Sequence, residues 1–415
     1  MSMPQREANF RIGPLGGRSL VVVMCLGQLG SLLPHVVVPS VLAQFLIPEW
    51  RLSGAQAGFL AGSYAAGYMV TVPILATLTD RIDARTILIV GSAVSAAGTL
   101  LFGVFAEGFW SGVLFWTVAG MGFGGAYMPG LKALTDRLGH GDWSRAVTLY
   151  TSSFSFAVGL SFLVSQLVAA RWGWRAAFLV TSLGPLAMIV ACLLLRPVRP
   201  KPTQGRLLNF APVVRNKPAM GFVLGYGAHC FELYGIRTWL VGFWTFVVAH
   251  QGAPSWLTPV LMSFCFAVIS MPASILGNEA ALKFGRHRAI TVVMLASACV
   301  AILIGFNASA PAWVVASLLM IYGLTVPADS GALTAGMSAA AVSEHRGATL
   351  ALQSTVGFGL SALGAWGTGL ALAAAGGPQS ARGWMLVFIV LAAGIAVGPL
   401  ALLWARLTPP KRQLP

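Results

Sequence analysis

The sequence predicts an all-α polytopic membrane protein, with 12 transmembrane helices in two parallel six-helix bundles around a central cavity. Of its 415 residues, 57% are hydrophobic and 9% are charged, whereas a soluble domain carries about 25% charged residues. So few charges cannot cover a water-facing surface, which excludes a soluble enzyme. The apolar runs are long and continuous rather than alternating, which argues against an outer-membrane barrel.

Twelve apolar runs are long enough to cross a bilayer, which takes roughly 20 residues. They lie at 19–47, 54–78, 86–106, 109–134, 145–169, 175–195, 218–249, 257–280, 289–308, 311–338, 346–375 and 382–405. The first run exceeds the ~7–15 apolar residues of a signal peptide, so it is predicted as a span. Residues 196–217 hold six Lys/Arg and no acid, and they predict a cytoplasmic linker between an N-terminal bundle, 1–195, and a C-terminal bundle, 218–415.

The basic residues predict the orientation. With both termini and the linker on one side, 21 of the 26 Lys/Arg collect there, and the positive-inside rule makes that side the cytoplasm. This distribution explains the net charge of +15 without a nucleic-acid partner. We expect a monomeric protein of the plasma (inner) membrane whose partner is the lipid bilayer. The five cysteines lie in apolar runs without metal-ligand spacing, so we expect no metal site and no disulfide framework.

An internal repeat supports the two bundles. The segment beginning Arg145-x-x-Thr148 recurs as Arg346-x-x-Thr349, an offset of 201 residues, and the segment beginning Gly173-Trp174 recurs as Gly383-Trp384. Six spans per repeat give both repeats the same orientation, related by an axis along the membrane normal. A cavity is then expected at their interface, near the middle of the membrane.

One cytoplasmic loop carries a recognisable motif. Residues 76–85 read Ala-Thr-Leu-Thr-Asp-Arg-Ile-Asp-Ala-Arg, which resembles the Gly-x-Leu-Ala-Asp-Arg-x-Gly-Arg-Arg signature of the major facilitator superfamily. The resemblance covers essentially the whole chain. It departs at both glycines, where Ala76 and Asp83 stand, and at one arginine, where Ala84 stands.

The motif's acid is expected to act as a conformational latch. An acid at the cytoplasmic end of a span can pair with a base or a helix terminus of the other bundle and hold the cytoplasmic side closed. The second copy, at 278–288, has Leu282 where the acid belongs. The predicted latch residues are Asp80, Arg81, Arg85, Lys283 and Arg286.

Two departures from subfamily motifs narrow the function. Trp116 occupies the place of the arginine that precedes Gly-x-Gly in the fourth span of the family. The fifth span lacks the Gly-Pro-x-x-Gly-Gly element typical of drug:proton antiporters. A drug exporter is therefore the less favoured alternative.

Ionisable residues inside the predicted spans are the main candidates for function, because each costs about 2.5–3.5 kcal/mol to insert. In the span at 218–249, Tyr226, His229 and Glu232 share one helix face, and His229 and Glu232 can touch at this spacing. Arg237 lies elsewhere on that helix, where it would pair with another helix or with a substrate. Glu232 with His229 is the favoured functional pair, whereas packed, structural roles remain open for His35 and Asp329.

Further polar stripes lie on three other spans. In this superfamily the first, fourth, seventh and tenth helices line the cavity. Three of the spans with polar stripes are the first, seventh and tenth: 19–47, 218–249 and 311–338. The predicted substrate and proton-pathway residues are Gln28, His35, Tyr226, His229, Glu232, Arg237, Tyr322, Asp329 and Gln353.

The predicted function is secondary active transport by alternating access, as a symporter or antiporter, of a small organic anion. Arg237 would bind the anion, and Glu232 or Asp329 would carry a proton. An exporter of cationic or neutral amphiphiles and a non-transporting receptor remain alternatives. An enzyme is not expected, since His-Glu-x-x-His, Gly-x-Ser-x-Gly and nucleotide-binding motifs are absent, and no cofactor is indicated.

Overall fold

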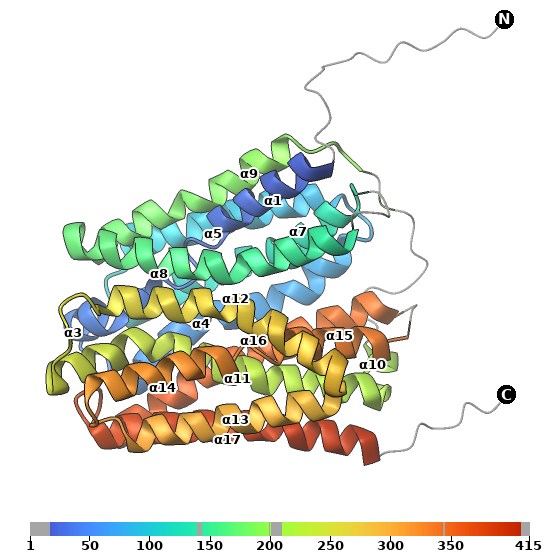
Figure 1. Cartoon of the computed structure of the whole chain (residues 1–415). Helices are drawn as coiled ribbons and strands as arrows, with labels where there is room; N and C mark the ends of the chain where they lie inside the picture. The colour runs from blue at the N-terminus through green and yellow to red at the C-terminus, as the bar shows by residue number, and fades with distance from the viewer. Residues whose placement is uncertain (1–16, 139–142, 199, 201–209, 343–344, 408–415) are drawn as a thin grey trace, which may run out of the picture.

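The computed structural model describes residues 17–138, 143–198, 200, 210–342 and 345–407, and all regular structure within them is helical. The helices lie side by side along one long direction (Figure 1). The start of the first helix and the end of the last lie at the same end of the bundle (Figure 1). The fold is therefore an all-α polytopic membrane protein, as the sequence predicts.

The first half of the chain contains the elements α1 (Gly17–Ser31), α2 (Val37–Val41), the π-helical turn η1 (Leu42–Leu46), α3 (Ile47–Trp50), α4 (Gly54–Leu78), α5 (Ala84–Phe105), α6 (Phe109–Gly124), α7 (Tyr127–Thr135), α8 (Trp143–Ser182) and α9 (Gly184–Leu193). The second half contains α10 (Ala211–Arg215), α11 (Lys217–Gln251), α12 (Pro259–Phe284), α13 (Arg286–Phe306), α14 (Ala312–Thr325), α15 (Ser330–Ala340), α16 (Arg346–Ala374) and α17 (Ala381–Leu407).

These helices account for all twelve predicted spans. Eight helical stretches of the described chain are long and apolar enough to cross a membrane, and one of them, Leu149–Leu193, contains two predicted spans. That stretch turns at Gly173, whose φ of 83° is a left-handed conformation that suits glycine. The remaining three spans are the broken segment α1–α3, the broken segment α6–α7 and the 35-residue helix α11.

Side-chain caps fix several helix starts. Ser53 and Gln56 form a reciprocal capping box at α4, Asp83 caps α5, and Thr258 caps α12. Each cap satisfies a backbone N–H that the first helical turn leaves without a partner. The Asp83 cap therefore fixes the start of α5 directly after the motif loop at residues 79–83.

Helices α4 and α16 pack backbone to backbone through a stripe of small residues, which we call the outer seam: Gly54, Gly58, Gly62, Ala362, Ala365 and Gly369. A Cβ atom on Gly54 would lie 2.8 Å from the carbonyl oxygen of Gly369, and one on Gly58 would clash with the carbonyl oxygen of Ala365. The seam occupies the first turns of α4 and the second half of α16, the ends that the sequence places outside the cell.

In Figure 1, α5, α7, α8 and α9 of the first half lie above α11, α13, α14 and α17 of the second half, and α4 lies between these two groups against α16. The division at residues 195 and 218 stays a prediction. Within the predicted linker, α10 is a short helix, and residues 199 and 201–209 lie outside the described residues.

Candidate functional site

A cavity of about 540 Å³ lies between α7 and α8 on one side and α11, α12 and α15 on the other. Its wall uses the first turns of α8, the second half of α12 and most of α15. These are the helix ends that the sequence predicts as cytoplasmic. The cavity and the outer seam are thus at opposite ends of the bundle.

Arg237 of α11 lines this cavity. The residue is only 4% exposed, and its Nη1 atom has no hydrogen-bond partner. Its guanidinium carbon lies 5.5 Å from the ring centre of Tyr234, one helical turn earlier. None of the ion pairs in the described part of the chain involves Arg237, so its charge is available to a bound anion.

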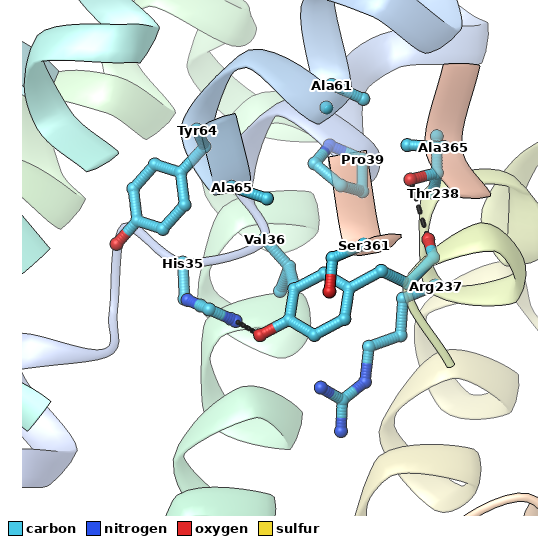
Figure 2. Close-up of a pocket in the computed structure, with 12 residues that line it drawn as sticks. His35, Val36, Pro39, Ala61, Tyr64, Ala65, Arg237, Thr238, Ser361 and Ala365 are labelled. Carbon is cyan, nitrogen blue, oxygen red and sulfur yellow. Dashed lines mark hydrogen bonds between the residues drawn. The ribbon is translucent and has the colours of Figure 1, made fainter. Parts of the chain in front are cut away.

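A second, much smaller cavity of about 20 Å³ adjoins Arg237 on the seam side, lined in part by Pro39, Ala61 and Ser361. Figure 2 shows the guanidinium of Arg237 pointing away from Pro39 and Ala61. Arg237 and Tyr234 line both cavities. These two side chains therefore lie between the large cavity and the small cavity on the side of the outer seam.

His35 joins the two halves at this point. Its Nε2 lies 3.1 Å from the hydroxyl of Tyr234, a hydrogen bond drawn as a dashed line in Figure 2. Four aromatic rings surround the imidazole, those of Tyr64, Phe123, Phe154 and Tyr234. The sequence analysis did not single out Tyr234, although its position three residues before Arg237 puts both on one helix face.

His229 and Asp329 form a close ionisable pair. The Nδ1 atom of His229 lies 2.7 Å from Oδ1 of Asp329, with side chains only 3% and 1% exposed. The contact is close by distance but is not aligned as a hydrogen bond. His229 lines the large cavity, and Asp329 stands directly before α15, between the lining residues Pro327 and Ser330.

Glu232 lies elsewhere. Its Oε1 atom accepts hydrogen bonds from the hydroxyls of Ser297, at 2.8 Å, and Tyr322, at 2.9 Å. Glu232 and Tyr322 are both fully buried, and neither lines the large cavity. The spacing-based pairing of His229 with Glu232 is therefore replaced by His229 with Asp329 and Glu232 with Tyr322.

Gln28 and Gln353 are not among the residues that line either cavity. The side-chain amide of Gln28 donates to the backbone oxygen of Tyr150 at 3.0 Å, which ties α1 to α8. That of Gln353 donates to the hydroxyl of Thr334 at 3.1 Å, and Thr334 lines the cavity. Of the nine predicted pathway residues, Tyr226, His229 and Arg237 line the large cavity, and His35 and Arg237 line the small one.

The motif loop carries an ion pair that the sequence did not predict. Asp83, at the position of a motif glycine, contacts Nη2 of Arg137 at 2.9 Å and accepts the backbone N–H of Val198 at 2.8 Å. Burial raises the pKa of Asp83, but the hydrogen bonds from Val198 and Arg137 outweigh it and leave the pKa below its usual value. The latch group Arg85 donates from Nε to the backbone oxygen of Cys192 at 2.7 Å.

The remaining predicted latch residues lie at the same end of the helices. Asp80 follows α4, and burial raises its pKa, with Lys132 opposing and Asp136 adding to that effect. Lys283 lies 5.3 Å from the ring of Phe284, and Nε of Arg286 has no hydrogen-bond partner. No ion pair among the described residues joins Asp80 to the second half of the chain.

Membrane-spanning helices that enclose a polar cavity with a buried arginine are the architecture of a membrane transport protein. The family model of the Major Facilitator Superfamily matches residues 24–365. The chain therefore belongs to this superfamily.

Solved structures share the fold over nearly the whole chain. A bacterial homologue of the human lysosomal transporter Spinster, in an inward-facing and occupied conformation, matches with 18% identity and a TM-score of 0.77, covering 95% of this chain and 98% of that one. The nucleoside transporter NupG matches with 15% identity and a TM-score of 0.69, covering 93% and 99%. The human organic anion transporter MFSD10 matches with 15% identity and a TM-score of 0.67, covering 92% and 98%.

Proposed function

We propose that this transporter carries a small organic anion by alternating access, with Arg237 as the group that binds the anionic end. The observation that carries the proposal is the Nη1 atom of Arg237, which lacks a hydrogen-bond partner although the residue lines the cavity and is 4% exposed. A buried guanidinium is costly without an anionic partner. A carboxylate in the cavity would supply that partner with two parallel hydrogen bonds.

Coupling to protons is assigned to His229 and Asp329 in place of Glu232. The imidazole of His229 lines the cavity and lies 2.7 Å from the carboxylate of Asp329, and both are groups that can bind and release a proton. Glu232 is held by two hydroxyls away from the cavity. Exchange of one anion for another is the alternative to proton coupling within the same proposal.

The orientation completes the proposal. Both termini lie in the cytoplasm of a monomer in the inner membrane, so the large cavity faces the cytoplasm and the outer seam closes the opposite side. Among the structural neighbours, one is described as an organic anion transporter and another as a proton dependent oligopeptide transporter. Their sequences are too different to extend those substrates to this chain.

Binding and counterflow measurements on the purified protein test the proposal. A thermal-shift screen should compare carboxylates with amines of matched chain length, and the best binders should then be loaded into proteoliposomes. Carboxylates should bind and drive counterflow. Preferential binding of amines would contradict the anion assignment and favour the exporter of cations, and binding without counterflow would indicate a receptor.

A further inference from the structure

The wall of the large cavity is rich in hydroxyl groups. Of its 25 lining residues, eleven carry a hydroxyl: Tyr127, Thr151, Ser152, Ser155, Tyr226, Tyr234, Ser270, Ser274, Ser330, Thr334 and Ser338. Hydroxyls in membrane helices often bond to their own backbone, as Ser270 does to Phe266 at 3.0 Å. A hydroxyl that donates in this way still has lone pairs that can accept a hydrogen bond from a ligand.

Some of these hydroxyls have no bond within the described protein at all. Ser152 and Ser155 of α8 and Ser338 of α15 line the cavity without a hydrogen-bond partner in the part of the chain that the structure describes. The side-chain oxygen of Asn278 is likewise buried without a partner. These groups lie on both walls of the cavity, so a ligand with several hydroxyls could bond to both halves of the transporter together.

The charges of the wall limit the number of carboxylates. Arg237 is the one Lys or Arg among the residues that line the large cavity. Glu279, the one acid in that lining, is exposed at the end of the cavity farthest from the seam. A second carboxylate on the ligand would therefore find no second cation and would be repelled by Glu279 at the entrance.

We infer that the substrate is a polyhydroxylated monocarboxylate, a sugar acid, with its carboxylate on Arg237 and its hydroxyls on the serine and threonine wall. The inference rests on the proposed anion transport and adds the chemistry of the ligand's remaining atoms. A plain fatty carboxylate would leave the hydroxyls of the wall unbonded. A neutral polyol would leave Arg237 unpaired.

Three matched kinds of probe separate these possibilities in binding measurements on the purified full-length protein. The sugar acids gluconate, galactonate and mannonate carry both the carboxylate and the hydroxyls, hexanoate carries the carboxylate alone, and sorbitol carries the hydroxyls alone. At least one sugar acid should bind about tenfold or more tightly than hexanoate, since several neutral hydrogen bonds are lost with the hydroxyls. Sorbitol should bind as weakly as hexanoate or more weakly.

Variants of the wall give a second readout. Ser155→Ala and Ser338→Ala, which remove two of the hydroxyls without a partner in the described chain, should each weaken binding of the preferred sugar acid a few-fold and leave hexanoate binding unchanged. Ser317→Ala is the matched control, because this exposed serine bonds to its own helix at Trp313 and does not line the cavity. An equal loss in the control would show a general effect on the fold and would overturn the reading of the two wall variants.

The outcomes distinguish this inference from the proposed function. Hexanoate binding as tightly as every sugar acid would overturn the hydroxylated substrate and leave the anion proposal standing. Sorbitol binding as tightly as the sugar acids would overturn both. Absence of binding by all three sugar acids would overturn the inference, whatever the other probes do.

Discussion

Substitutions of Arg237 can separate the effect of its positive charge on binding from the effect of its planar guanidinium group. Its charge has no acidic partner among the described residues, and its guanidinium lies over the ring of Tyr234. Lysine keeps the charge but cannot form two parallel bonds to a carboxylate. Glutamine removes the charge and keeps a polar side chain.

Arg237→Lys should weaken carboxylate binding about tenfold, and Arg237→Gln should weaken it further, measured by calorimetry on the purified protein. Arg382→Gln is the control, because Arg382 lies at the start of α17, outside the cavity lining. Unchanged affinity in both Arg237 variants would remove this residue from the binding site.

Asp329 and Glu232 should respond differently to loss of charge. Asp329→Asn removes the anionic partner of His229 beside the cavity, so pH-gradient-driven accumulation in proteoliposomes should fall at least tenfold while counterflow persists. Glu232→Gln keeps an oxygen that can accept from Ser297 and Tyr322, so accumulation should stay within about twofold of wild type. The reverse pattern would return the proton to Glu232, as the sequence alone favoured.

The sequence predicted which ionisable residues are buried, but it did not predict which residues they contact. The cost of burying charge identified Arg237, His229, Glu232 and Asp329 correctly as buried groups. Helical spacing then placed His229 beside Glu232, because one helix's periodicity contains no information on which other helix lies opposite. The contact of His229 with Asp329 joins residues 100 positions apart, beyond what local spacing can show.

Asp83 connects three elements at the end of the bundle that the sequence predicts as cytoplasmic. It caps α5 through the N–H of Arg85, pairs with Arg137 after α7, and accepts the N–H of Val198 after α9. A substitution there should loosen all three connections together. The sequence did not predict this role, because the family's motif has an uncharged glycine at the position of Asp83.

Asp83→Asn should lower the thermal unfolding midpoint in detergent by roughly 2 °C at pH 6, in line with loss of about 1.5 kcal/mol of charged hydrogen bonding. Because the pKa of Asp83 is depressed in the folded protein, this stabilisation is complete above the unfolded value near 3.8 and is lost as the pH falls further. The midpoints of wild type and variant should therefore converge below about pH 4.

Asp136→Asn serves as the control for this measurement. Asp136 pairs with Lys132 four residues earlier on the helix surface, and such exposed pairs contribute only about 0.3–0.5 kcal/mol. A control effect as large as that of Asp83→Asn would mean that general loss of negative charge, not the three connections, lowers the midpoint.

A substitution of Asp80 tests the predicted latch between α4 and the second half of the chain. Asp80→Asn should destabilise the state that is closed to the cytoplasm and increase the inward-open population. On a cysteine-free background, Ser274→Cys in the large cavity should then react faster with a water-soluble maleimide, and Ala61→Cys on the seam side more slowly. Equal labelling rates with and without the change would leave Asp80 as an ordinary loop charge.

Most helices were predictable from apolar length and from the breaks between runs. The boundaries of α4 and α12 agree with the predicted spans to within a few residues. The breaks within α1–α3 and between α6 and α7 were not predicted, because hydropathy averages over a window and cannot detect a single non-helical turn. Both breaks lie beside the cavities, at His35 and Tyr127.

At the scale of the whole molecule, the structure corresponds to one state of the alternating-access cycle proposed above. The large cavity lies between the two halves of the chain at one end of the bundle, and the outer seam is packed closed at the other end. The polytopic fold followed from composition, and the repeat predicted a cavity between equivalent bundles. The sequence did not predict which conformation the structure has, because the same sequence must form both the inward-open and the outward-open state.

A larger side chain in the seam should shift that choice. Gly58→Leu cannot fit against the carbonyl oxygen of Ala365, so the outer ends of α4 and α16 should separate and favour the outward-open state. Ser361→Cys beside the small cavity should become reactive to maleimide, and Ser274→Cys less so. Gly58→Ala should give the same change at smaller amplitude.

Gly108→Leu is the matched control, because a Cβ there meets nothing within 4 Å. Both variants require a thermal unfolding midpoint near that of wild type, which shows that the bundle still folds. Unaltered labelling in a stably folded Gly58→Leu protein would contradict a role of the seam in closing the outer side.

The composition of the seam also sets the heat capacity of outward opening. Separating large aliphatic side chains would raise the heat capacity by about 0.45 cal/mol/K for each Å² of apolar surface, whereas exposed polar backbone lowers it by about 0.26. Parting Gly54, Gly58, Gly62 and Gly369 exposes carbonyl groups with little side chain, so the two contributions oppose each other. The enthalpy of the conformational exchange should then be nearly constant with temperature, and a van't Hoff plot of the two populations should be close to a straight line.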